Sequence, residues 1–95
     1  MKVLDDIGMC VAYKGYYYWK EAIKIVMEMK DEDEINMTEI YKKIAEKYNK
    51  KETIISINMA RVLEKIKDLN KKLNVEYKLT TKKLLILLVK KEKGE

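Results

Sequence analysis

Two runs of apolar residues at helical spacing, joined by a short polar turn, constrain the fold more than any other feature of this sequence. Asn36, with Glu39 three residues later, resembles a capping box, and Asn49 suits a left-handed C-cap. The helix between them has its apolar face at Ile40, Tyr41, Ile44, Ala45 and Tyr48. After a turn at about residues 49–52, a longer helix over about 53–70 continues the spacing with Ile55, Met59, Val62, Ile66, Leu69 and Leu73. This order predicts a helix–turn–helix.

The N-terminal third predicts two further helices. Residues 3–7 form a short helix that Gly8 stops, and residues 9–15 are a connector. A helix over about residues 16–30 follows, with a buried face formed by Trp19, Ala22, Ile23, Val26 and Met27. The aromatic run 16–19 could stack single-stranded bases, but at helical spacing its rings point in different directions. We therefore expect these rings to divide between core and surface.

The C-terminal segment leaves two alternatives open. Residues 82–93 could form a helix, or residues 75–79 and 84–89 could be the strands of a β-hairpin wing. Leucine and lysine favour the helix. A helix that is apolar nearly all round needs burial on several sides, which suggests a dimer contact. The prediction is one all-α domain over residues 1–95 with about five helices, and a winged helix is the alternative.

The charge distribution is uneven along the chain. Residues 1–34 carry five Lys against eight acids, whereas residues 35–95 carry sixteen Lys or Arg against eight acids. A polyanion would therefore meet the C-terminal two-thirds, unless the lysines only keep the surface solvated. The longest apolar run, residues 84–89, is too short to cross a membrane, and there is one cysteine. We expect a cytoplasmic protein with no membrane partner.

Residue types needed for common catalytic and metal sites are missing. The chain has no histidine, Cys10 has no second thiol, and three scattered glycines cannot form a phosphate-binding loop. The acidic run at residues 31–34 lacks the alternation and the glycine of an EF-hand, so we interpret it as a solvated loop. We expect no cofactor, no metal and no enzymatic activity.

Motifs along nearly the whole chain resemble a known family. The resemblance begins with Ile7-Gly8, Lys14-Gly15-Tyr16, Tyr18 and Glu21-Ala22-Ile23, and continues through Tyr41, Ile44-Ala45, Lys47 and Tyr48-Asn49 to Glu64 and from Thr80 to Lys91. These residues resemble the C-terminal effector domain of the sporulation-initiation response regulator of endospore-forming bacteria. The resemblance implies an all-α helix–turn–helix domain that binds double-stranded DNA as a head-to-tail homodimer on short repeated sites. In the family a receiver domain precedes this module; the 95 residues contain none, so we expect a stand-alone domain.

The sequence departs from the family in the recognition helix. The family has arginine, glutamate and arginine where this chain has Ile54, Ser56 and Ile57, and arginine and histidine where it has Ala60 and Arg61. An isoleucine cannot replace the bidentate contact of arginine with guanine. The expected DNA-binding residues are Lys50, Lys51, Thr53, Ser56, Ile57, Asn58, Arg61 and Lys65. Among these, Asn58 could pair with adenine, isoleucines could contact thymine methyl groups, and lysines could hold phosphates.

The same departure supports a second hypothesis. Ile54 and Ile57 should lie on the outward side of the helix, because Ile55, Met59 and Val62 already face the core. Exposed apolar patches often mark protein interfaces. The alternative function is therefore a protein-interaction module that uses the Ile54/Ile57 face. The main hypothesis is a DNA-binding transcriptional regulator, or an accessory factor of a mobile element.

Overall fold

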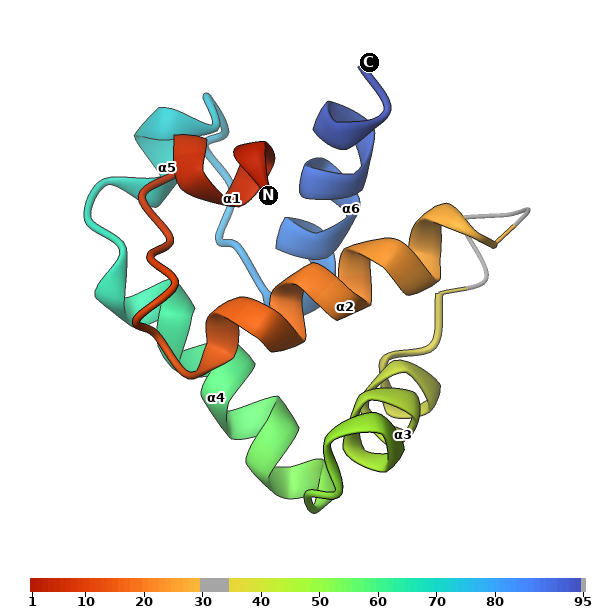
Figure 1. Ribbon diagram of the computed structural model, residues 1–95. Helices are drawn as coiled ribbons and strands as arrows, with labels where there is room; N and C mark the ends of the chain where they lie inside the picture. Colours follow the sequence, from red (N-terminus) through yellow and green to blue (C-terminus); the bar gives the residue numbers. More distant parts are fainter. Residues whose placement is uncertain (30–34, 95) are drawn as a thin grey trace.

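The computed structural model describes residues 1–29 and 35–94, and every regular element in these ranges is a helix (Figure 1). The elements are α1 (Lys2–Asp6), α2 (Gly15–Met27), α3 (Met37–Tyr48), α4 (Glu52–Lys65), α5 (Leu69–Lys72) and α6 (Thr81–Glu92). The predicted all-α fold is confirmed. The hairpin alternative is wrong, because the second expected strand lies inside α6. The acidic run at residues 31–34 lies outside the described residues.

Helix α2 crosses the middle of the molecule and packs against α3, α4 and α6 (Figure 1). Trp19, Ala22, Ile23 and Val26 have no exposed surface, as their spacing predicted. Met27 was expected beside them but is 38% exposed, because this last residue of α2 lies about 100° round the helix from Val26. The aromatic run divides as predicted: three rings are buried and the fourth, Tyr17, is half exposed.

The helix–turn–helix forms where the caps predicted it. The Asn36 side chain accepts hydrogen bonds from the backbone N–H groups of Thr38 and Glu39, at 3.0 and 3.4 Å. Asn49 ends α3 in the left-handed conformation, with φ 53°. Because a left-handed residue reverses the chain within a few residues, Lys50 and Lys51 suffice to connect α3 to α4.

The long helix predicted over residues 53–70 is shorter than expected. Helix α4 ends at Lys65, Ile66 is extended, and Asp68 is left-handed with φ 55°. A straight helix of 18 residues would be about 27 Å long, close to the 34 Å longest extent of the molecule. The break instead folds the chain back, so that Leu69 and Leu73 enter the same core as the rest of the stripe. Apolar spacing does not reveal such a break, because both halves satisfy it.

Helices α1 and α6 complete the core on the other side of α2 from α3 (Figure 1). Thr80 caps α6 by accepting from the Lys83 backbone N–H at 3.2 Å. Four of the six apolar residues at 84–89 are buried within this domain, and Ile86 and Leu87 are half-buried. The monomer therefore already covers most of the apolar surface that suggested a dimer contact.

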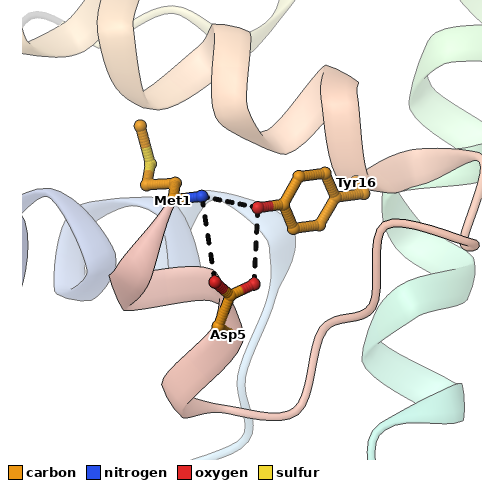
Figure 2. Close-up of polar contacts among 3 residues, drawn as sticks. All are labelled: Met1, Asp5 and Tyr16. Atoms are coloured by element: carbon orange, nitrogen blue, oxygen red, sulfur yellow. Dashed lines mark hydrogen bonds and ion pairs between the residues drawn. The ribbon is translucent and has the colours of Figure 1, made fainter.

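A polar contact fixes α1 to the start of α2 (Figure 2). The amino nitrogen of Met1 donates to the Tyr16 hydroxyl at 2.6 Å, and that hydroxyl donates to Asp5 Oδ1 at 3.4 Å. The amino group also lies 4.0 Å from Asp5 Oδ2. Tyr16 is 3% exposed, so this contact satisfies the one polar atom of a buried ring.

Candidate nucleic-acid interface

Two contacts with α2 hold the recognition helix α4 in place. A Cβ atom on Gly15 would lie 2.7 Å from the Asn58 carbonyl oxygen and 2.8 Å from Val62 Cγ2, so only glycine permits this approach. One turn further along α2, the buried Trp19 indole N–H donates to the Met59 carbonyl oxygen at 3.1 Å. The glycine–tyrosine motif and the tryptophan thus position the helix that carries the candidate site.

The outward side of α4 presents a narrow apolar strip. Ile54 and Ile57 are 40% and 49% exposed, whereas Ile55 and Met59 are fully buried. The sequence prediction that Ile54 and Ile57 face outward is therefore confirmed. Thr53 and Arg61 are also exposed, one turn before and one turn after Ile57.

The predicted set of DNA-binding residues does not share one face. Successive residues of an α-helix are rotated by about 100°, so Ser56 and Asn58 lie on opposite flanks of the strip. Two hollows lie beside α4, and Asn58 lines both. Arg61 and Lys65 line one of them with Asn58, and Ile54 lines the other. The hollows therefore bring Ile54, Asn58, Arg61 and Lys65 together, Thr53 and Ile57 lie one turn apart on the exposed side, and Ser56 lies on the far flank from Asn58.

Two polar side chains of α4 bond to their own helix. The Asn58 Nδ2 group donates to the Ile54 carbonyl oxygen at 2.8 Å, and the Ser56 hydroxyl donates to the Thr53 carbonyl oxygen at 3.0 Å. A bidentate contact between Asn58 and adenine requires the same Nδ2 group. The bond to Ile54 uses one of the two Nδ2 hydrogens, so Asn58 has one N–H and Oδ1 left for a base, whereas the isoleucines are already exposed.

Basic side chains from three parts of the chain border the strip. Lys50 and Lys51 are exposed in the turn before α4, and Arg61 and Lys65 are exposed in its second half. The connector before α2 adds Lys14, which lines a hollow of about 320 Å³ together with Arg61 and Lys65. These five cations, Lys14, Lys50, Lys51, Arg61 and Lys65, are called the basic rim below.

Sequence reasoning missed two residues of this surface, Lys14 and Tyr17. Both line a second hollow of about 460 Å³ whose walls also include Lys50 and Ile54. Tyr17 is 49% exposed, so its ring extends the apolar strip of α4. They lie about forty positions before α4 in the sequence, and only the packing of α2 on α4 brings them to the site. The sequence signals were the place of Lys14 in the Lys14-Gly15-Tyr16 motif and that of Tyr17 in the aromatic run 16–19.

Lys65 of the basic rim lies over the Tyr13 ring, 5.6 Å from its centroid, and nearby Lys47 is left out of the rim because its charge is paired with a carboxylate. Lys47 donates to Glu21 Oε2 at 2.7 Å and so connects α3 to α2. This hydrogen bond raises the pKa of Lys47 above its ordinary value. Within residues 1–29 and 35–94, no cluster of three metal-ligating side chains occurs, and no helix is long and apolar enough to span a membrane.

The comparison with known families agrees with this arrangement. Residues 1–85 match the family described as "Sporulation initiation factor Spo0A C terminal". The match covers most of the 95-residue chain, so the chain belongs to this family, whose domain is a DNA-binding effector of transcription. No curated protein and no solved structure is significantly similar to the chain.

Proposed function

We propose, from the premise that the chain belongs to the Spo0A C-terminal family, that it is a stand-alone DNA-binding protein. It acts as a transcriptional regulator or as an accessory factor of a mobile element. Its mechanism is the insertion of α4 into the major groove of double-stranded DNA, the usual placement of the second helix of a helix–turn–helix. No catalytic step is part of this function.

The single observation that carries this mechanism is the combination of an exposed strip on α4 with the basic rim around it. A major groove presents base edges at its centre and phosphates at both borders. Ile54 and Ile57 lie in the middle of the exposed face, while the five rim cations come from α4, the preceding turn and the connector. Base contacts at the centre and phosphate contacts at the rim match this layout.

The test is a selection of bound duplexes from a random DNA pool, repeated at two salt concentrations. Sequence-specific binding enriches a motif, and log K falls with log salt by about 0.9 for each phosphate contact. The double variant Lys51→Ala with Arg61→Ala should abolish tight binding and leave the circular dichroism spectrum unchanged. Lys90→Ala is the matched control, because this exposed lysine lies on α6. If the double variant binds every duplex as the parent does, groove insertion is wrong.

The exposure of Ile54 and Ile57 also supports a second candidate function. A protein-interaction module would bury this strip against a protein partner, since exposed apolar patches often serve that purpose. Under this alternative, Ile54→Asp disrupts a partner complex, whereas Lys51→Ala with Arg61→Ala has little effect. The two variants therefore separate the functions when both are tested for DNA binding and for protein capture.

The proposal includes a homodimer on DNA and a cytoplasmic location. Head-to-tail dimers on short repeated sites follow from the resemblance to the family. The half-buried Ile86 and Leu87 on α6 leave a small apolar surface that such a contact can use. Sedimentation of the protein with and without a duplex carrying two copies of the selected motif measures this directly. One protein per motif at all concentrations would contradict the dimer.

A further inference from the structure

We infer that Ile54 and Ile57 recognise thymine methyl groups, so that the DNA site has thymines opposite the first two turns of α4. This inference rests on the proposed DNA-binding function and names the base that its site selects. The two side chains form the centre of the exposed face, and they are 40% and 49% exposed.

The spacing of the two isoleucines matches neighbouring base pairs. Three residues of an α-helix advance about 4.5 Å along the axis, and successive base pairs are about 3.4 Å apart. Ile54 and Ile57 therefore face the same base pair or adjacent ones. Both project from the N-terminal half of α4, the part of a recognition helix that contacts base edges.

The chemistry of isoleucine permits one kind of favourable base contact. Its side chain has no donor or acceptor, and the C5-methyl of thymine is the apolar group that the major groove exposes on a base pair. Facing a guanine or a cytosine, the same side chain would remove water from polar edges without replacing their hydrogen bonds. The strip therefore favours thymine and disfavours G·C pairs at these positions.

The neighbouring side chains do not compete for this role. The Nδ2 group of Asn58 is bonded to the Ile54 carbonyl oxygen at 2.8 Å. Arg61 lies one turn beyond Ile57, within the basic rim and beside Lys65 and Lys14. The strip is thus apolar at its centre and cationic at its border. That charge complementarity favours a polyanion such as duplex DNA over a neutral protein surface.

The experiment replaces thymine by uracil in the selected duplex, one position at a time. Uracil keeps every hydrogen-bonding group of thymine in the groove and removes the C5-methyl alone. At a position that contacts Ile54 or Ile57, the Kd should rise about fourfold, the factor expected for one buried methyl group. The variants Ile54→Ala and Ile57→Ala should bind the thymine and uracil duplexes equally at the position each contacts. Met27→Ala, which removes an exposed apolar side chain from α2, should keep the full discrimination.

Each outcome decides the inference. A motif with thymines whose replacement matters in the parent, but not in one of the isoleucine variants, supports it. A motif that binds with unchanged affinity after every uracil substitution overturns it and leaves the proposed DNA-binding function intact. A motif that contains only G·C pairs at its centre also overturns the inference and leaves the proposed DNA-binding function intact. Absence of DNA binding by the parent protein overturns both.

Discussion

Adding one methyl group at Gly15 should destabilise the whole domain, because this residue is where α2 meets α4. The new Cβ atom would lie 2.7 Å from the Asn58 carbonyl oxygen and 2.8 Å from Val62 Cγ2. The first of these atoms belongs to helix backbone, so it cannot move without shifting α4. Overpacking of this kind costs about 1–3 kcal/mol. The higher helix propensity of alanine offsets at most about 1 kcal/mol.

From about 2 kcal/mol, the middle of the overpacking range, less an offset of up to about 1 kcal/mol, the expected net loss for Gly15→Ala is about 1–2 kcal/mol, or roughly 4–16 °C in Tm for a domain of this size. Thermal and urea unfolding followed by circular dichroism measure both quantities. Gly94→Ala is a partial control for adding a methyl group: no atom lies within 4 Å of its Cβ position, and the only strain comes from the φ of 84° at this residue. That variant, close to the C-terminal end, should change stability much less.

A double-mutant cycle with Val62→Ala tests the stated cause. Val62→Ala removes the atom 2.8 Å from the new Cβ, so it relieves one of the two clashes. The double variant should then be more stable than the sum of the two single effects predicts. A Gly15→Ala protein as stable as the parent would refute the close approach of α2 and α4. If the two changes in the free energy of unfolding are strictly additive, the clash with Val62 is not the cause of the lost stability.

Two further changes test the cap of α3 and the buried tyrosine of α2. Asn36→Ala removes the acceptor of two first-turn N–H groups and should cost about 1 kcal/mol in urea unfolding; an unchanged midpoint would show that the cap contributes nothing. Burial, followed by the negative charge of Asp5, raises the pKa of Tyr16 above 10.0. The unfolded chain therefore loses this proton at lower pH than the folded one, so stability falls as pH rises above about 10. Unfolding measured between pH 8 and 11 should show a shallower fall for Tyr16→Phe and the parental fall for the exposed Tyr17→Phe, and equal slopes in all three proteins would contradict this assignment.

Features that depend on a few adjacent residues were predictable. The cap at Asn36, the left-handed Asn49 and the buried stripe of α2 each follow from residue type and spacing within one or two turns. The outward direction of Ile54 and Ile57 followed in the same way, since Ile55 and Met59 occupy the inner face. Helical rotation alone fixes which side chains share a face.

Helix ends without a cap were not predictable. Helix α4 was expected to reach about residue 70 but ends at Lys65, and α2 was expected to reach about residue 30 but ends at Met27. Past the end of α4 the apolar spacing continues with Ile66, Leu69 and Leu73. The position of the break depends on where the core lies in space, because Leu69 and Leu73 must return to it. Such information is absent from local periodicity.

Residue type and local spacing are enough to predict the helix–turn–helix and the apolar centre of the candidate interface, because each depends on contacts between near neighbours in the chain. Helix packing alone completes the border of that centre. It brings Lys14 and Tyr17 from the start of α2 to the side of α4. A surface composed of separate elements depends on how helices pack, and at Gly15 that packing is set by the absence of a single methyl group.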